Sequence, residues 1–320
     1  MVDVVVLDDW QDVARSFAAW ARLSDRARVH FRHDHLFDPD VLVEELHHAA
    51  VVVAMRERTA FPSSVLERLP QLRLLVTAGM GNAAIDLEAA AALGITVSGT
   101  AMRTPPTAEL TWGLILAALR HIPEEHQRVR DGLWQGSVGT DLAERRLGLI
   151  GLGRLGGRVA RVGLAFDMDV VAWSQNLTQE RADEVGVGYV DLDELLATSD
   201  IVSLHLRLSP RTRGLLGDRE LRLMKPTALL VNTSRGPLVD EDALVAALAE
   251  GRLRGAALDV FDEEPLPPGH RLRTAPRVLH TPHLGYVTEA SYERIYGDVV
   301  EDIEAWLDGA PIRVLAPAPD

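Results

Sequence analysis

The sequence predicts an α/β protein with two doubly wound parallel sheets. Short β-branched runs alternate with helix-like segments in two successive series, and such alternation is typical of parallel sheets with helices on both faces. A chain of 320 residues also fits two domains better than one. The third observation is a glycine-rich turn, Gly151 to Gly156, between an apolar run and a helix-like segment of the second series.

The first series occupies the first hundred residues. Asp38 and Pro39 predict the N-cap and first turn of one helix, and Gly94 predicts the C-terminal cap of another. Because the apolar runs between such segments are short and rich in β-branched residues, we expect them to be buried strands. These expected strands are residues 3–7, 29–31, 51–55, 72–77 and 95–98.

The second series opens with a long helix. Thr104, followed by Pro105 and Pro106, predicts its N-cap and first turn. An amphipathic segment at 288–309 has the length of a helix that packs back on the first series. Between the two lie further expected strands, residues 146–150, 169–173, 187–190, 200–204, 227–232, 255–260 and 277–280.

Composition limits the classes of partner. The net charge is −14, which disfavours nucleic acid and anionic membranes and requires a local cationic pocket for an anionic substrate. The chain has no cysteine, so disulfides, thiolate nucleophiles and Cys-ligated zinc are excluded. The N-terminus lacks the features of a signal peptide, and no run reaches the ~18 apolar residues of a membrane span. We expect a cytoplasmic protein.

The glycine-rich turn predicts a dinucleotide site. Gly151, Gly153 and Gly156 satisfy G-x-G-x-x-G between a strand and a helix. In that setting the glycines allow a tight turn, approach of a pyrophosphate and close helix–strand packing. A tight turn without a ligand is the alternative. The next strand ends in Ser174 and Gln175 with no acid to repel a 2′-phosphate, so we expect NADPH to be accepted as well as NADH.

Candidate catalytic groups follow three later strands. Arg235, Asp259 with Glu264, and His283 each come just after an apolar run, at the edge where open α/β sheets bind ligands. Each alone has an ordinary explanation as a surface charge, a loop acid or a structural histidine. The run His30 to His35 admits a metal-site reading, but its spacing matches no metal motif and a solvated strand end is preferred.

Five ordered motifs carry a family resemblance. They are GLGRLG at 151–156, H-x-x-L-S-P-x-T from His205 to Thr212, VNTSRG, LDVFDEEP and TPHLG. With them the sequence resembles the D-isomer-specific 2-hydroxyacid dehydrogenase family over most of its length. The resemblance implies a Rossmann cofactor domain at 102–287, inserted into a flavodoxin-like substrate domain made of 1–101 and 288–320.

The resemblance also implies site residues. Arg235 would hold the substrate carboxylate, His283 would be the acid/base, Glu264 its carboxylate partner, and Asp259 would lie near the nicotinamide carboxamide. Arg56, Ala78, Gly79 and Met80 would line the substrate with Arg235, although Asn82-Ala-Ala-Ile-Asp86 departs from the family's usual Asp-Asn pair. The cofactor-binding set would be Gly151, Gly153, Arg154, Leu155, Gly156, Ser174, Gln175, His205, Leu206, Thr212, Thr233, Ser234, Asp259 and Gly285.

The implied activity is hydride transfer between NADP or NAD and a small anionic 2-keto or D-2-hydroxy acid. An imidazolium suits proton delivery to the carbonyl oxygen, and an Arg fork suits a carboxylate. A relative acting on phosphite or formate and a non-catalytic dinucleotide sensor are the alternatives; Glu264 argues against formate, whose enzymes carry an amide there. The segment from Thr104 to residue 136 resembles the one through which the family forms two-fold dimers, so we expect a homodimer.

Overall fold

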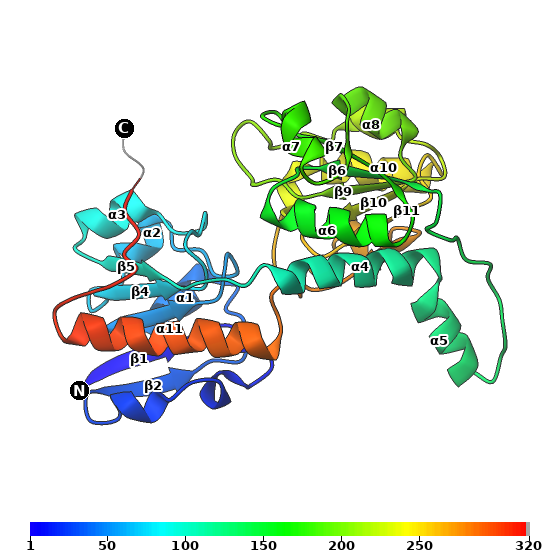
Figure 1. The fold of residues 1–320 in the computed structure, drawn as a ribbon. Coiled ribbons are helices and arrows are strands. Elements are labelled where there is room, and N and C mark those ends of the chain that lie inside the picture. Colours follow the sequence, from blue (N-terminus) through cyan, green and yellow to red (C-terminus); the bar gives the residue numbers. More distant parts are fainter. Residues whose placement is uncertain (318–320) are drawn as a thin grey trace. The chain divides into compact units, whose positions relative to one another are not determined.

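The computed structural model describes residues 1–317 and divides into two compact units (Figure 1). Unit 1 consists of Met1–Arg103 and Val287–Asp320, and unit 2 is Thr104–Tyr286. The units therefore begin and end within two residues of the boundaries expected at 101/102 and 287/288. Unit 2 is a continuous insertion, whereas unit 1 is assembled from both ends of the sequence.

Unit 1 is built on a parallel sheet with the strand order β2-β1-β3-β4-β5, the order of flavodoxin-like doubly wound sheets. Its alternate strand residues pack against α1, α2 and α3 on one face. The strands are β1 (Val2–Val6), β2 (Ala27–Phe31), β3 (Val51–Ala54), β4 (Leu74–Thr77) and β5 (Thr96–Gly99). The helices are α1 (Pro39–Leu46), α2 (Ser63–Leu66), α3 (Leu87–Ala92), α11 (Glu289–Leu307) and the 3₁₀ turns η1 (Ala14–Ser16) and η2 (Trp20–Leu23).

The C-terminal part of the chain completes unit 1. Helix α11, orange in Figure 1, packs on β4, as its amphipathic pattern predicts. Beyond it the chain pairs antiparallel with β5: Gly99 N–H donates to the Arg313 carbonyl (3.0 Å) and Leu315 N–H donates to the Val97 carbonyl (2.8 Å). These bonds satisfy the free edge of β5, which would otherwise present unpaired backbone groups.

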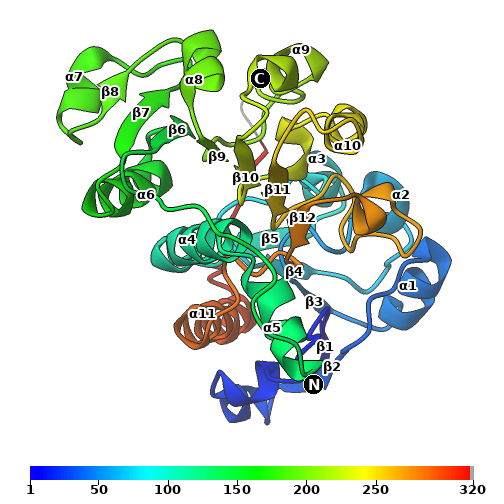
Figure 2. The ribbon, with the colours of Figure 1, turned by 90° about the vertical axis from the view of Figure 1, so that its right-hand side faces the viewer.

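Unit 2 contains a parallel sheet in the order β12-β11-β10-β9-β6-β7-β8 (Figure 2). Counted from β6, this is the 3-2-1-4-5-6 order of a Rossmann fold with one further strand. The predicted fold class is confirmed. The strands are β6 (Arg146–Ile150), β7 (Asp169–Trp173), β8 (Gly188–Tyr189), β9 (Ile201–Leu204), β10 (Leu229–Asn232), β11 (Gly255–Leu258) and β12 (Val278–His280).

Helices cover both faces of the unit 2 sheet. On β6, Leu147 and Leu149 point into one core with α4 and α6, while Ile150 points into the other core with α8 and α10. This alternation follows from the two-residue period of a strand. The helices are α4 (Pro105–Leu119), α5 (Ile122–Arg130), α6 (Arg154–Ala165), α7 (Gln179–Asp183), α8 (Leu192–Thr198), α9 (Asp218–Leu223), α10 (Glu241–Ala249) and the 3₁₀ turns η3 (Gly236–Leu238) and η4 (Arg271–Thr274).

The predicted caps are present, and one of them lacks a side-chain bond. Asp38 accepts a bond from Asp40 N–H (2.8 Å) at the start of α1, and Gly94 adopts the left-handed conformation (φ +70°) after α3. Thr104 precedes α4 but its side chain makes no capping bond. The reason is that Pro105 and Pro106 have no N–H, which removes the donor at the second helical position.

No helix within residues 1–317 combines the length and apolar character needed to cross a membrane.

One buried carboxyl group in unit 1 makes stability depend on pH. Asp302, on α11, is fully buried; its Oδ1 accepts a bond from Arg313 Nε (2.9 Å), and its Oδ2 has no partner in the described part of the chain. Burial raises the pKa of Asp302 to about 7, against the opposing effect of Arg313. A folded-state pKa above the unfolded value means that the stabilisation is present at acid pH and is lost as the pH rises through about 7.

We therefore expect Asp302→Asn, which stays neutral at every pH, to flatten the pH dependence of stability. Between about pH 5 and pH 8 the free energy of unfolding of the wild type should fall by on the order of 2 kcal/mol more than that of the variant. Urea unfolding at both pH values measures this difference. Asp308→Asn, at an exposed position near the end of α11, is the control. Parallel pH profiles for wild type and Asp302→Asn would contradict the assignment.

Candidate active site

The glycine-rich turn is shaped for a phosphate group. Gly151 has φ +109°, and a Cβ atom there would lie 2.6 Å from the His205 carbonyl oxygen. A Cβ on Gly156 would lie 2.0 Å from the Gly151 carbonyl oxygen, so α6 and β6 meet at backbone distance. Gly153, by contrast, faces open space and begins α6 without a side-chain cap. The N–H groups of this helix end are thus offered to an anion.

His205 and Thr212 shape the loop that follows β9. Burial lowers the pKa of His205 to about 3, so its ring is neutral at physiological pH. Ring Nε2 lies 3.0 Å from Ser203 Oγ, while Nδ1 is buried without a partner among residues 1–317. Thr212 Oγ1 donates to the Arg207 carbonyl (2.7 Å), and this bond closes the loop. Both residues therefore organise the backbone around the glycine-rich turn.

The end of β7 is polar and lies beside the loop after β9. Gln175 Nε2 donates to the Arg211 carbonyl (3.2 Å), which links the two loops directly. Ser174 is half-buried, and Arg154 and Arg211 are exposed. No carboxylate follows β7 before Glu180, so negative charge is absent from the strand end itself.

His283 and Glu264 form a bonded pair. The His283 Nδ1 and Glu264 Oε2 atoms lie 2.5 Å apart, and both side chains are largely buried. Glu264 Oε1 accepts the Phe261 N–H (3.0 Å), which fixes the carboxylate from its other side. The Tyr286 ring lies edge-on to the imidazole at 5.6 Å between centroids. With Nδ1 bound to the carboxylate, Nε2 is the ring atom left to exchange a proton with a substrate.

Asp259 holds the segment that carries His283. Its fully buried carboxylate accepts bonds from Thr281 Oγ1 (2.6 Å), Leu284 N–H (2.7 Å) and Gly285 N–H (2.9 Å). Burial raises the pKa of Asp259, and these three donors oppose the rise. The family resemblance places Asp259 near the nicotinamide; its contacts in the structure are with the backbone and side chains on either side of His283.

Arg235 lies on a loop held by polar contacts. Asn232 Nδ2 donates to the Arg235 carbonyl (2.9 Å), and Ser234 N–H donates to Asn232 Oδ1 (3.0 Å). Thr233 Oγ1 lies 2.8 Å from Thr111 Oγ1 on α4, and Ser234 Oγ donates to the carbonyl of the last β9 residue (2.7 Å). Asn232 and Thr111 were not predictable from the sequence, since an amide and a hydroxyl inside apolar segments carry no catalytic signature.

In unit 1 the structure brings Arg56, Ala78 and Gly79 together. Arg56 Nη1 donates to the Ala78 carbonyl (3.0 Å), and a Cβ on Gly79 would lie 2.3 Å from that same Nη1 atom. Met80 is exposed beside them. Asn82, which departs from the family pattern, donates to the Arg56 carbonyl (2.6 Å) and thereby holds the left-handed Arg56 backbone.

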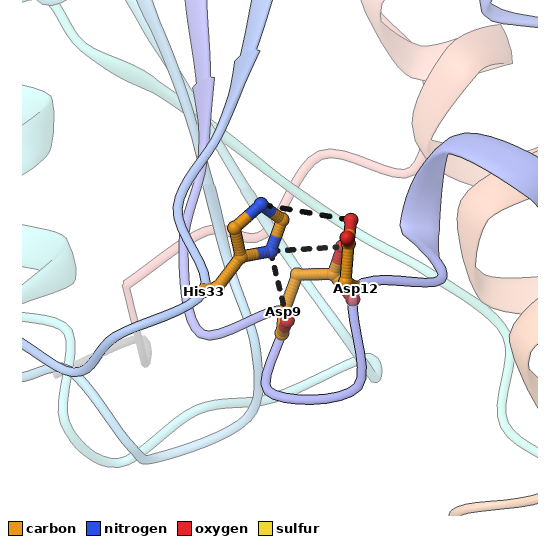
Figure 3. A group of neighbouring side chains, drawn as sticks. All are labelled: Asp9, Asp12 and His33. Carbon is orange, nitrogen blue, oxygen red and sulfur yellow. Dashed lines mark hydrogen bonds and ion pairs between the residues drawn. The ribbon is translucent and has the colours of Figure 1, made fainter.

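The histidines between residues 30 and 35 do not form one cluster. His30 pairs with Asp3 (3.3 Å) and His35 with Asp8 (2.8 Å), whereas His33 lies near Asp9 and Asp12 (Figure 3). The carboxylate at position 9 already accepts hydrogen bonds from the backbone N–H groups at positions 13 and 14. We assign no metal to this group.

Comparison with known proteins identifies the family. The pattern of the D-isomer specific 2-hydroxyacid dehydrogenase NAD binding domain matches residues 112–285. The glyoxylate reductase of Aeropyrum pernix is 42% identical over 255 residues, which cover 77% of this chain and 76% of that enzyme. The chain belongs to the D-isomer-specific 2-hydroxyacid dehydrogenase family. The D-3-phosphoglycerate dehydrogenase of a Synechocystis strain is 38% identical, and the match spans 82% of this chain but only 48% of that longer protein.

Solved structures of the family agree with this membership. A phosphoglycerate oxidoreductase from Vibrio cholerae superposes with a TM-score of 0.92 at 36% identity, covering 97% of this chain and 100% of its own. An acyclic imino acid reductase in complex with NADPH superposes with a TM-score of 0.75 at 25% identity, covering 98% and 99%. This member of the 2-hydroxyacid dehydrogenase family is therefore an NAD(P)-dependent oxidoreductase of D-2-hydroxy acids, and unit 2 contains its NAD-binding domain.

Two glycines of this turn are expected to differ in their effects on stability and on NADPH binding. Gly153→Ala should fold normally, because its Cβ meets open space, yet raise the dissociation constant of NADPH ~10-fold or more by occupying the phosphate approach. Gly156→Ala should lower the melting temperature, because its Cβ would clash with backbone. Cofactor fluorescence titration and thermal unfolding measure the two effects.

Gly157→Ala is the matched control, since its Cβ also meets open space but lies four residues, about one turn, beyond Gly153 in α6. The interpretation fails if Gly153→Ala binds NADPH as tightly as wild type.

Proposed function

We propose that the protein reduces a small 2-keto acid of the glyoxylate type to the D-2-hydroxy acid, with His283 as acid/base. The observation that carries the proposal is the His283–Glu264 pair at 2.5 Å, on loops that follow strands of the dinucleotide-binding sheet. The relative named glyoxylate reductase, which this chain matches over 76% of that enzyme's length, supports the small substrate.

The chemistry divides among a few groups. NAD(P)H supplies a hydride to the carbonyl carbon of the substrate. His283 delivers a proton from Nε2 to the carbonyl oxygen, and Glu264 stabilises the imidazolium before transfer. The Arg235 guanidinium clamps the substrate carboxylate and thereby orients the carbonyl. In the reverse direction the neutral imidazole accepts the proton from the hydroxyl group.

Unit 1 is proposed to supply the rest of the substrate site. Arg56, over Gly79 and beside Ala78, offers a partly buried cation with N–H donors at the carboxyl edge of the unit 1 sheet. Ligands of open α/β sheets bind at that edge, near the position where the strand order reverses. A substrate domain made of unit 1 and a cofactor domain made of unit 2 account for the two sets of residues.

Replacing His283 tests the proposed function. His283→Ala should lower kcat for glyoxylate or hydroxypyruvate reduction ~10²–10⁴-fold and leave the dissociation constant of NADPH within about twofold, because only proton transfer is lost.

Glu264→Gln should make activity fall at a lower pH than in wild type, because the imidazolium loses its stabilising charge. Steady-state assays with a panel of 2-keto acids measure both. His47→Ala, an exposed histidine on unit 1, is the control; full activity of His283→Ala would refute the role.

We propose that NADPH is used at least as well as NADH. Support comes from the neutral end of β7 and from the bond between Gln175 and the Arg211 backbone, which places a loop with exposed arginines beside that strand end. Ser174→Asp should shift the ratio of kcat/KM values ~10-fold or more toward NADH, because a carboxylate repels the 2′-phosphate and binds the ribose hydroxyls. Gln179→Glu adds the same charge on α7 as a control. A thousandfold wild-type preference for NADH would oppose the proposal.

We further propose a cytoplasmic homodimer. The cytoplasm is supported by the dependence of the reaction on nicotinamide dinucleotides. Dimerisation is supported by α5 and the segment after it, which project from unit 2 in Figure 1 and expose apolar side chains. Trp134 is 72% exposed and Val138 90% exposed, with Val129 and Leu133 nearby in sequence. Large exposed apolar groups of this kind are typical of an interface.

Sedimentation at micromolar concentration tests the dimer. The wild type should sediment at twice the 35.0 kDa chain mass, and Trp134→Glu should shift it toward the monomer because a buried charge destabilises an apolar interface. Phe37→Glu, at an exposed position of unit 1, should leave the dimer unchanged. A wild-type monomer would disprove this assembly.

A further inference from the structure

A second carboxylate–histidine pair lies in unit 2, apart from His283 and Glu264. Glu241 is the first residue of α10, and His270 immediately precedes η4. Ring atom Nδ1 of His270 accepts the Leu272 N–H (3.3 Å), so the neutral ring carries its proton on Nε2. That Nε2 lies 3.3 Å from Glu241 Oε2, and both side chains are mostly buried. Burial raises the pKa of Glu241.

Glu241 of this pair binds the backbone two residues before Glu264, the proposed partner of His283. Glu241 Oε1 accepts the Asp262 N–H (2.8 Å), while Glu264 Oε1 accepts the N–H of the preceding residue, Phe261 (3.0 Å). Two consecutive backbone amides thus donate to two carboxylates. One of those carboxylates bonds His283 and the other bonds His270.

The same peptide also touches the loop of the proposed substrate clamp. A Cβ atom added to Gly236 would lie 2.0 Å from the Phe261 carbonyl carbon and 2.4 Å from Asp262 N. Gly236 directly follows Arg235. The Phe261–Asp262 peptide is therefore in backbone contact with the Arg235 loop. Its N–H group donates to Glu241, and the N–H of the peptide immediately before it, that of Phe261, donates to Glu264.

Helix capping does not explain this use of Glu241. The N-cap of α10 is Asp240, whose side chain accepts the Ala243 N–H (3.0 Å). The next acid, Asp242, is 86% exposed and pairs with Arg271. Glu241 alone among these three acids turns toward the Asp262 amide, and His270 bonds its second oxygen.

We propose that Glu241 and His270 are positioning residues, which fix the Phe261–Asp262 peptide and through it the orientation of Glu264 toward His283. The proposal rests on the proposed function, in which His283 and Glu264 carry the proton. Loss of the pair frees the Asp262 amide and lets the peptide rotate. The Phe261 N–H, which donates to Glu264 Oε1, then moves with the peptide. The Glu264 carboxylate is less well oriented toward His283 and stabilises its imidazolium less.

Variants separate positioning from general stability. Glu241→Ala should lower kcat for 2-keto acid reduction ~10-fold, leave KM for NADPH within about twofold, and make activity fall at a lower pH. His270→Leu should act in the same direction, whereas His270→Gln, which keeps an N–H donor for Glu241, should restore most of the activity. Asp242→Asn is the matched control on the same helix turn. The groups that bear on the His283 titration are Glu264, Asp259 and the Tyr286 ring.

An activity-independent measurement distinguishes this proposal from the proposed function. The ring signals of His283, assigned with His283→Ala among 11 histidines in labelled protein, are titrated by NMR without substrate. The titration midpoint should fall in Glu241→Ala and stay in place in Asp242→Asn. If the His283 midpoint shifts in Glu241→Ala but the wild type reduces no 2-keto acid, the proposed function is refuted and the positioning role of Glu241 is supported. An unmoved midpoint, or a kcat within twofold of wild type, would overturn the positioning, even if the melting temperature fell.

Discussion

Buried carboxylates that accept backbone N–H groups determine the geometry of the unit 2 site. A buried carboxylate without donors is strongly unfavourable, so the chain around it must bring donors inward. Asp259 meets this requirement with Thr281, Leu284 and Gly285, and thereby sets the turn on which His283 lies with φ +54°. Because the left-handed conformation is costly for histidine, it persists only where neighbouring bonds impose it.

In unit 1 a buried cation, Arg56, organises the backbone around it, as the buried carboxylates do in unit 2. Arg56 also adopts the left-handed conformation, with Asn82 bonded to its carbonyl and its guanidinium bonded to the Ala78 carbonyl. The guanidinium occupies the space that a side chain at position 79 would fill, and the backbone there has φ +98°, a conformation that favours glycine. The two loops that follow β3 and β4 are thus joined by two hydrogen bonds.

The sequence predicted the fold well because its signals are local. The β-branched runs, Asp38 and Gly94 act within a few residues, and the expected strands all occur, although β8 is shorter and β11 ends before Asp259. Thr104 is the N-cap of α4 as predicted, but it makes no side-chain capping bond because Pro106 has no N–H at the second helical position. The role of His283 with Glu264 stays a prediction, although the structure brings the two side chains together.

Contacts between distant residues were not predictable in this way. Glu241 and His270 are separated by a helix and a strand, and each alone has the appearance of a surface residue. The histidines at 30, 33 and 35 suggested a single group because they are close in sequence, yet each faces a different carboxylate. Only the packed backbone determines such pairings.

The discontinuity of unit 1 has a consequence for biosynthesis. Unit 2 is continuous, so all its strands have been synthesised before α11 begins. Unit 1 must wait for α11 and for the residues near Val314 that pair with β5, and its N-terminal sheet meanwhile exposes the apolar surface that α11 later covers. Domains generally fold as units during synthesis. We therefore expect unit 2 to complete its fold before unit 1, although the unit 1 sheet is synthesised first.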